Sequence, residues 1–239
     1  HPSISSVTFA DGDYVNAAED NSASNLVIVT SGAEDSQTVT ATLNSADYTC
    51  SVSSNTCTAS ITAAGLQALT SGTAYTFSVA VSDAAGNAAT ADTSESFTYD
   101  PTAPTMTISS TTVSSGDTSN DATIALAFTS SESTTDLVVG DITLSGGTLS
   151  SFAGSGASYT ATFTPSSDGA TSISIAAGKF TDADGNDNTV SNTFAWTFDS
   201  TALTITIASS TSGVTSGSTT NDASIAVTFT TSESTTGFA

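Results

Sequence analysis

Apolar residues recur at every second position in several short stretches of the chain. The positions between them hold Ser, Thr or Ala, and the stretches are 75–81, 124–128, 159–163 and 173–175. A period of two places the apolar side chains on one face of a β-strand and the small side chains on the other. The pattern therefore predicts half-buried strands with one face in water.

Turn-forming residues separate these stretches. Gly combined with Ser, Asp or Asn occupies 115–117, 145–147, 167–169 and 183–186, and the segment that favours a helical turn is 63–69. About seven short strands per hundred residues, with turns between them, are typical of an immunoglobulin-like (Ig-like) sandwich. We therefore expect an all-β fold.

Longer motifs repeat along the chain. Asn-Asp-Ala, three alternate apolar residues and a Glu occupy 120–132 and return at 221–233, an offset of 101 residues (221 − 120). Two further pairs of motifs have an offset of 99 residues (182 − 83 and 196 − 97): 83–87 with 182–186, and 97–100 with 196–199. An interval this long corresponds to a whole domain. We expect tandem Ig-like β-sandwich domains of about 100 residues each, arranged as beads on a string, at 1–100 and 101–200, with the N-terminal part of a third, incomplete repeat at 201–239.

The composition of the chain excludes two classes of partner. The 239 residues contain 23 acidic side chains and one Lys or Arg, which gives a formal net charge of −22. Nucleic acid and anionic lipid both require clustered basic residues, so neither is an expected partner. No stretch approaches the length of apolar sequence that spans a membrane. Because the chain opens at His1 and the third repeat is short, we expect a processed or excised segment of a longer protein, or a subunit completed by a neighbour.

The chain has two cysteines, Cys50 and Cys57. The residues between them are enough for a hairpin that places the two sulfur atoms opposite each other, and this predicts a disulfide. The alternative is a pair of buried thiols. A metal site is disfavoured, because the pair lacks further Cys ligands or a nearby His.

Two motifs characterise the end of the first repeat. One is the alternating strand followed by Asp-Ala-Ala-Gly-Asn at 75–87, and the other is Phe-Thr-Tyr-Asp-Pro-Thr-Ala-Pro at 97–104. Together they resemble the bacterial Ig-like repeats of giant surface adhesins and biofilm proteins, although the second linker, 199–203, lacks the final proline. The resemblance implies an extracellular, cell-surface chain that serves as an extender or adhesive stalk. It also implies calcium between domains.

Acidic residues from three segments are expected to meet where the first two domains join. In an Ig-like sandwich the B–C and F–G loops lie at the pole where the chain enters. Placing strand B at about 122–129 leaves Glu132 in the B–C loop. The F–G turn and the entering linker add the remaining candidates, Asp182, Asp184, Asn186 and Asp100. Carboxylates this close repel each other, and Ca2+ with its oxygen ligands relieves that repulsion, so we predict a Ca2+ site here. An ordinary turn rich in Asp, Gly and Asn is the alternative.

The same reasoning applies to the other ends of the domains. Asp199 and Glu233 are the metal candidates at a second junction, whose F–G loop lies outside the chain. The A–B loop of the first domain faces the second and carries Asp11, Asp13 and Glu19. At the opposite pole we expect a half-site for a further domain, formed by Glu34, Asp35, Asp83 and Asn87.

The sequence gives no support for catalysis. His1 is the only histidine, so neither a Ser-His-Asp nor a Cys-His arrangement is available beyond the terminus. Trp196 aligns with Phe97 in the repeat, so we expect it in the core rather than on a sugar-binding surface.

The expected function is therefore an extracellular structural or adhesive stalk stiffened by calcium. Its expected partners are further repeats or other copies of the chain, and a host-cell or surface ligand held by a tip domain outside the chain. The alternative is a subunit of an extracellular filament in which 201–239 pairs with a neighbouring chain by strand addition. A ligand-binding adhesin domain requires a flat or aromatic patch that interrupts the repeat, and a spacer module of a secreted enzyme is a further alternative.

Overall fold

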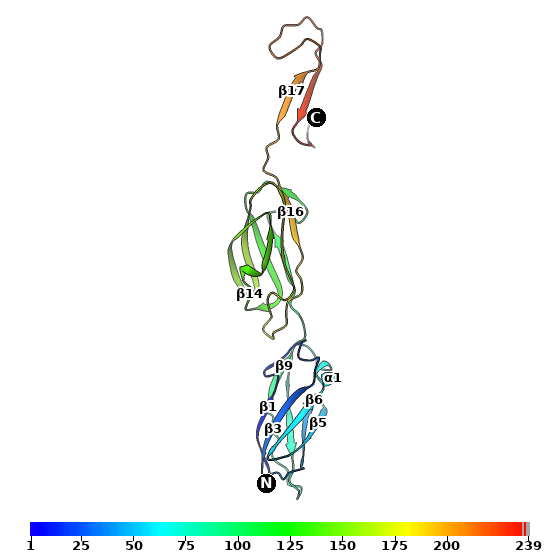
Figure 1. Ribbon diagram of the computed structural model, residues 1–239, viewed down its shortest axis with the longest axis vertical. Helices are drawn as coiled ribbons and strands as arrows, with labels where there is room; N and C mark the ends of the chain where they lie inside the picture. Colours follow the sequence, from blue (N-terminus) through cyan, green and yellow to red (C-terminus); the bar gives the residue numbers. More distant parts are fainter. Residues whose placement is uncertain (236, 238–239) are drawn as a thin grey trace.

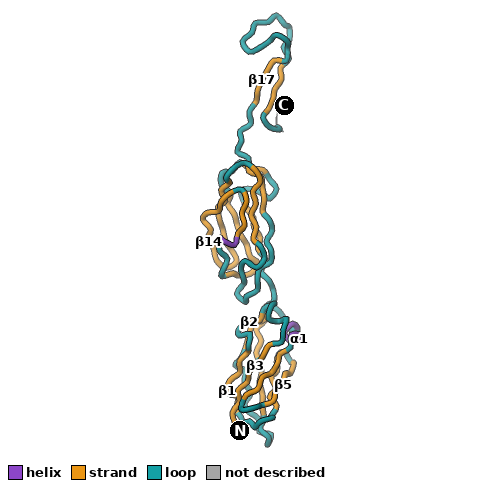
Figure 2. The backbone as a smooth tube through the Cα atoms, viewed as in Figure 1, coloured by secondary structure: helices purple, strands orange, loops and turns teal. Residues whose placement is uncertain are grey.

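The computed structural model describes residues 1–235 and residue 237 (Figure 1). Two β-sandwiches and a C-terminal β-hairpin follow one another along a single long axis, and each of these parts is joined to the next by a short linker. Strands and loops make up almost all of the described chain, with one short α-helix and one 3-10 turn (Figure 2). The all-β prediction is confirmed.

The first sandwich consists of β1–β9 and the helix α1. Its first layer has the strand order β1-β3-β6, and its second layer combines β5-β4-β8 with β2-β9-β7. β7 and β8 are consecutive parts of one strand, interrupted only at Phe77, which is why the two groups form one layer. The elements are β1 (Ser3–Phe9), β2 (Tyr14–Val15), β3 (Ser24–Ser31), β4 (Thr38–Leu43), β5 (Ala46–Ser51), β6 (Thr56–Ile61), α1 (Ala63–Gln67), β7 (Thr73–Thr76), β8 (Ser78–Val81) and β9 (Ser96–Tyr99).

The second sandwich has the same arrangement of two facing layers. One layer has the order β10-β12-β14 and the other has the order β11-β16-β15-β13. The elements are β10 (Met106–Ser110), β11 (Thr118–Ser119), β12 (Ile124–Thr134), the 3-10 turn η1 (Val139–Asp141), β13 (Ile142–Ser145), β14 (Gly147–Pro165), β15 (Gly169–Ile175) and β16 (Phe194–Phe198).

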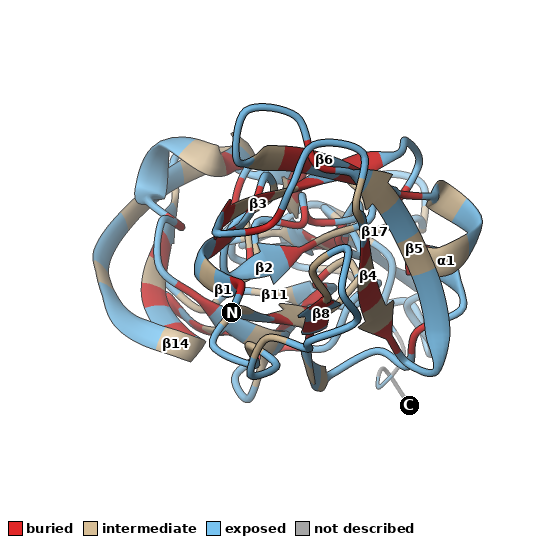
Figure 3. Ribbon diagram, turned by 90° about the horizontal axis from the view of Figure 1, so that it is seen from below, coloured by how far each residue is buried: buried red, intermediate tan, exposed pale blue. Residues whose placement is uncertain are grey.

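Each sandwich has its own hydrophobic core. The buried residues lie mainly on the strands, and most of the loops are exposed (Figure 3). In the first sandwich, Phe9 of one layer packs against Phe77 and Phe97 of the other, with ring centroids 5.1 and 4.9 Å apart. In the second sandwich, Phe163 meets Trp196 edge-on at 4.9 Å. Trp196 is 3% exposed, so its predicted place in the core is confirmed.

The C-terminal hairpin pairs β17 (Ile205–Ser209) with β18 (Val227–Thr231). It repeats the pairing of β10 with β12, but its apolar residues are exposed where their counterparts in the second sandwich are buried. Ile207 is 63% exposed, whereas its counterpart Ile108 is 2% exposed. The domain boundaries at 1–100, 101–200 and 201–239 remain a prediction.

Candidate functional site at the junction of the two sandwiches

The linker between the sandwiches, 100–104, is attached to both of them. Its first residue, Asp100, donates its backbone N–H to the carbonyl of Val15 at 3.0 Å. The Asp100 side chain accepts hydrogen bonds from the hydroxyl of Ser71 and the backbone N–H of Thr102. At the other end, the carbonyl of Pro104 accepts a hydrogen bond from Thr189 of the second sandwich. Two prolines in five residues further restrict the backbone, so the linker is extended and stiff.

The F–G turn of the second sandwich, 182–186, is a rigid loop that we call the docking turn. The Asp182 carboxylate accepts hydrogen bonds from the backbone N–H groups of Asp184 and Asn186, both at 2.9 Å, and from the Asn186 side-chain amide at 3.0 Å. Gly185 has φ +86°, a conformation that glycine adopts without steric cost. These bonds hold the Asn186 side chain in a fixed direction.

Asn186 joins the two sandwiches directly. Its side-chain oxygen accepts a hydrogen bond from the backbone N–H of Ala17 at 3.0 Å, and its side-chain nitrogen donates to the Asp100 carbonyl at 2.8 Å. A third contact runs from the Asn16 side-chain amide to the Asp184 carbonyl at 3.3 Å. A hollow of about 280 Å³ remains between 16–18, Ala103 and 185–187.

The loop that meets the docking turn, 16–20, is held from inside the first sandwich, and we call it the receiving loop. The hydroxyl of Tyr99 donates to the buried carboxylate of Asp20 at 2.7 Å. Burial, together with this hydrogen bond and the nearby acidic charge, raises the pKa of Tyr99 to about 12. The side chain of Gln67 donates to the Asp20 carbonyl, and Asn16 caps the N–H groups of Ala18 and Glu19. The receiving loop is therefore preformed.

Four carboxylates lie within electrostatic reach of one another at this junction. Burial raises the pKa of Glu132, and the charges of Asp100, Asp182 and Asp184 raise it further. Burial likewise raises the pKa of Asp184, with added repulsion from Asp100 and Asp182. For Asp100, burial acts upward, but the hydrogen bonds from Thr102 and Ser71 hold the pKa below its usual value. The charges of the linker, β12 and the docking turn therefore act on one another, and the role of Asp100, Glu132, Asp182, Asp184 and Asn186 in metal binding stays a prediction.

The donors at this junction suit calcium in chemistry, because all of them are carboxylate, amide or carbonyl oxygens. Their arrangement is less complete. Within the described residues, no three His, Cys, Asp or Glu side chains are gathered closely enough to hold a metal ion. The oxygens of Asp182 point into their own turn, and Asp100 is engaged by Ser71 and Thr102. The charges of these carboxylates act on one another, while the Asp182 and Asp100 oxygens are engaged by hydrogen bonds within their own segments.

One expected position at this junction is wrong, and two contacts were not anticipated. Glu132 lies inside β12 rather than in a loop, because β12 continues to Thr134 after a register shift that follows Thr129. Asn16 and Ala17 make the contacts to the second sandwich, from the loop for which the sequence indicated Asp11, Asp13 and Glu19. The repeat contains a sequence signal that could have identified Asn16. Asn120 and Asn221 occupy the corresponding position, before strand B, in the later repeats.

The second predicted metal pair, Asp199 and Glu233, is not brought together by a hydrogen bond among the described residues. Asp199 accepts from the N–H of Thr201, and the Glu233 carbonyl accepts from Thr231. Their role in metal binding stays a prediction.

At the far pole of the first sandwich, the predicted group is partly connected. Glu34 accepts a hydrogen bond from the N–H of Ala84 at 3.0 Å, and Asp83 accepts from both the backbone and the side chain of Asn87. The hydrogen bonds from Asn87 lower the pKa of Asp83. Asp35 turns elsewhere and accepts from Ser54.

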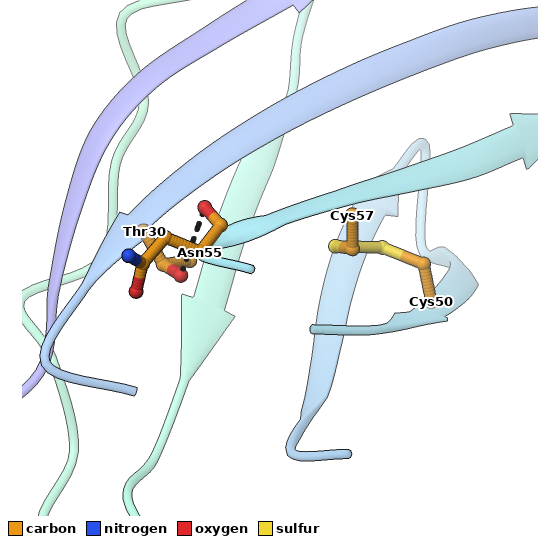
Figure 4. The surroundings of a disulfide bond; sticks show 4 residues. All are labelled: Thr30, Cys50, Asn55 and Cys57. Carbon is orange, nitrogen blue, oxygen red and sulfur yellow. Dashed lines mark hydrogen bonds between the residues drawn. A yellow bond between two sulfur atoms is a disulfide. The ribbon is translucent and has the colours of Figure 1, made fainter. Parts of the chain in front are cut away.

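The predicted disulfide between Cys50 and Cys57 is present (Figure 4). Its place differs from the expected hairpin, because Cys50 lies on β5 and Cys57 on β6, which belong to different layers. The disulfide therefore links the two layers at one edge of the first sandwich, with a Cα–Cα distance of 5.7 Å. Next to it, the Asn55 carbonyl accepts hydrogen bonds from the N–H and the hydroxyl of Thr30.

The layers β1-β3-β6 and β10-β12-β14 correspond to strands A, B and E of an Ig-like domain. The facing strands C, F and G correspond to β4, β7–β8 and β9 in the first sandwich and to β13, β15 and β16 in the second. Paired layers of this kind around separate cores define a chain of Ig-like β-sandwiches. Residues 100–198 match the family model of the bacterial Ig-like domain. The match covers the second sandwich and its linker, which confirms the resemblance read from the repeats. No curated protein matches the chain in sequence.

Three solved structures are similar to the chain at a low level. One is of a 1.5-MDa bacterial ice-binding adhesin, with 23% identity, 82% of this chain and 62% of that chain covered, and a TM-score of 0.41. The second is of a Ca2+-stabilized adhesin with which an Antarctic bacterium binds ice, with 22% identity, 87% and 51% covered, and a TM-score of 0.40. The third is of a tetra-tandem repeat in the extending region of a large adhesion protein, with 21% identity, 88% and 53% covered, and a TM-score of 0.35. The chain thus spans between half and two thirds of their length, and the fold assignment depends on the strand pairing and the family model.

Proposed function

We propose that the chain is a spacer segment of an extracellular stalk, in which bacterial Ig-like sandwiches are joined end to end into a stiff rod. The observation that supports this most directly is the bonded junction. Asn186 makes hydrogen bonds to both Ala17 and Asp100, and the linker is fastened at Asp100 and at Pro104. A rod holds a terminal binding domain at a fixed distance from a surface, and the stiffness of its junctions determines that distance.

The surface of the chain agrees with a structural role outside the cell. A charge of −22 over 239 residues keeps such a rod soluble and prevents neighbouring rods from collapsing onto one another. A disulfide across the layers of the first sandwich suits an oxidising compartment. Within the described part of the chain, no helix has the length and apolar character that a membrane span requires. The proposed role is mechanical rather than catalytic.

Calcium is the second part of the proposal. Burial raises the pKa of Glu132 and of Asp184, and the charges of Asp100 and Asp182 raise both pKa values further, so repulsion adds to the cost of keeping these two carboxylates charged. One divalent cation would offset that repulsion and would draw the linker, β12 and the docking turn together. To bind it, the Asp182 and Asp100 side chains would exchange their present hydrogen bonds for the cation.

Small-angle scattering in millimolar calcium and in excess EDTA tests both parts. If the chain is a stalk, the particle should be elongated and of constant mass in both solutions. If calcium stiffens it, the maximum dimension should be larger and the distribution of interatomic distances better defined with the metal than in EDTA. The matched pair of variants is Asp184→Asn at the junction and Asp168→Asn at the opposite pole of the second sandwich. Only Asp184→Asn should abolish the response to calcium. Equal dimensions in calcium and EDTA would remove calcium from the proposal, and compact or disordered dimensions in both would remove the stalk.

A second candidate function is supported by the C-terminal hairpin. Leu203, Ile205, Ile207, Ile225 and Val227 are between 45% and 63% exposed, and in the second sandwich the corresponding face is covered by the opposite layer. Strands supplied by a neighbouring chain would cover it and would link chains into a filament. Light scattering distinguishes this function, because it predicts a mass that increases with concentration, whereas the spacer predicts a constant mass.

A further inference from the structure

The F–G turn of the first sandwich, 83–87, reproduces the docking turn bond for bond. The Asp83 carboxylate accepts hydrogen bonds from the backbone N–H groups of Ala85 and Asn87, at 3.1 and 2.7 Å. Its second oxygen accepts from the Asn87 side-chain amide at 2.9 Å. Asp182 makes the same three bonds within the docking turn. Both turns place glycine at a positive φ, +84° at Gly86 and +86° at Gly185.

The two turns differ in what they meet. Asn186 is 4% exposed, because the first sandwich covers it and uses both of its side-chain atoms. Asn87 is exposed. Across residues 1–235 and 237, its side-chain oxygen accepts no hydrogen bond, and its side-chain nitrogen bonds only Asp83. The turn at 83–87 is thus built like the docking turn and lies at the pole that points away from the second sandwich (Figure 1).

We propose that the turn at 83–87 is an interaction surface that docks on the receiving loop of another sandwich of this kind, joined to the chain ahead of Pro2. Asn87 accepts a hydrogen bond from the loop N–H that corresponds to Ala17 and donates one to the linker carbonyl that corresponds to Asp100. This inference rests on the proposed end-to-end rod and assigns the residue that recognises the preceding domain.

The small size of the contact identifies the partner as a tethered domain rather than a separate chain. At the observed junction, three hydrogen bonds cross between the docking turn and the first sandwich with its linker. Three hydrogen bonds are fewer than the roughly ten that cross a typical interface between separate proteins. A short linker supplies a local concentration on the order of millimolar, at which such a contact becomes effective.

The start of the first sandwich matches the end of the linker in detail. Pro2 and Pro104 are both buried, and each precedes by two residues an inward side chain of the first strand, Ile4 or Met106. A linker that ends at Pro2 therefore enters the first sandwich as 100–104 enters the second.

The test uses the full chain with a second copy of 1–102 fused ahead of His1. The new linker then reads Asp-Pro-Thr-His-Pro in place of Asp-Pro-Thr-Ala-Pro, so its length equals that of 100–104. Small-angle scattering should show the added sandwich in line with the others. Asn87→Ala should lower the ratio of docked to undocked forms by about fivefold for each hydrogen bond lost, which broadens the distance distribution. Asp92→Ala is the matched control. Asp92 is half-buried, and among the described residues its carboxylate bonds only Ser94 in its own segment, so its removal should leave the junction unchanged.

A second variant removes the partner atom instead of the turn. Ala17→Pro in the added copy alone deletes the N–H that Asn87 is proposed to bind, and it should loosen the new junction to a similar extent. Thermal unfolding establishes that each variant is folded. The inference is wrong if the added sandwich lies in line with the others but neither variant loosens its junction. It is also wrong if the added sandwich moves freely while the original junction remains stiff. If the original junction is itself flexible in the unextended chain, the proposed rod fails instead.

Discussion

Replacement of Asn186 by Ala tests the junction at its central residue. The change deletes the hydrogen bonds to the Ala17 N–H and to the Asp100 carbonyl, and it also deletes one bond within the docking turn, to Asp182. A net hydrogen bond contributes about 0.5–1.5 kcal/mol, so the two bonds across the junction contribute about 1–3 kcal/mol together. This free energy corresponds to a fall of about 5- to 150-fold in the ratio of docked to undocked junctions.

The assay is 15N relaxation, which reports how each sandwich tumbles. In the wild type the two sandwiches should share one long, anisotropic correlation time, because the junction couples them. In Asn186→Ala each sandwich should tumble with a shorter time of its own, and the melting temperature of the second sandwich should fall slightly through the lost bond to Asp182.

The control for this variant is Asn188→Ala, two residues further along. Asn188 is 2% exposed, and among the described residues its side chain bonds only within the second sandwich, to Ala176, Thr189, Lys179 and Phe180. It should destabilise that sandwich and leave the joint tumbling intact. The reasoning is refuted if Asn186→Ala tumbles as the wild type does, or if Asn188→Ala uncouples the sandwiches equally.

Three further predictions concern single features. Reduction of the Cys50–Cys57 disulfide should lower the free energy of unfolding of the first sandwich by about 2.5 kcal/mol, because the unfolded chain gains loop entropy. Denaturant unfolding with and without reductant measures this loss of stability. An unchanged unfolding midpoint would contradict the prediction. Tyr99→Phe leaves the Asp20 carboxylate buried without its hydroxyl donor and should cost about 1–3 kcal/mol. The pKa of Tyr99 is raised to about 12 in the folded protein. The wild type should therefore become less stable as the pH rises from about 10 toward 12. Melting curves at alkaline pH should show a smaller decline for Tyr99→Phe, which has no hydroxyl to ionise. Burial, with added repulsion from Asp100, Asp182 and Asp184, raises the pKa of Glu132. The charged form of Glu132 therefore destabilises the fold, an effect that is absent at acid pH and develops as the pH rises through that pKa. Glu132→Gln should raise the melting temperature in EDTA at pH 7, and a decrease measured by calorimetry would contradict this cost of burial and repulsion.

Much of the fold can be predicted from local sequence pattern, because apolar and polar residues alternate in a strand that has one buried face and one face in water. The stretch 75–81 shows this, since Phe77, Val79 and Val81 are buried and the residues between them are exposed. Strand β14 shows the limit. Its 19 residues include Gly154 and Gly156, and its first half lacks regular alternation. Only 156–163 pairs with β12, whereas Phe152 stacks on Tyr159 and the Ser150 hydroxyl donates to the Thr162 carbonyl, so the segment folds back on itself near the two glycines.

The candidate site was predictable in its charges and not in its contacts. The strand order of an Ig-like sandwich is enough to assign carboxylates to one pole of the domain. It predicts that Asp100, Glu132, Asp182 and Asp184 lie at the same pole. The contact of Ala17 with Asn186 joins residues far apart in sequence through a backbone N–H, which leaves no trace in residue type. The disulfide is a similar case, because the spacing of Cys50 and Cys57 suits a link within one layer as well as a link between two.

The distance between the two sandwiches in solution tests the central claim most directly. Spin labels attached through unnatural amino acids at Thr38 of β4 and Thr143 of β13, both exposed, leave the disulfide untouched. Pulsed electron paramagnetic resonance in calcium should give one narrow distance distribution, which broadens in Asn186→Ala. A broad distribution in the wild type, unaffected by calcium and by Asn186→Ala, would show that the sandwiches are loosely strung and would contradict the stiff rod.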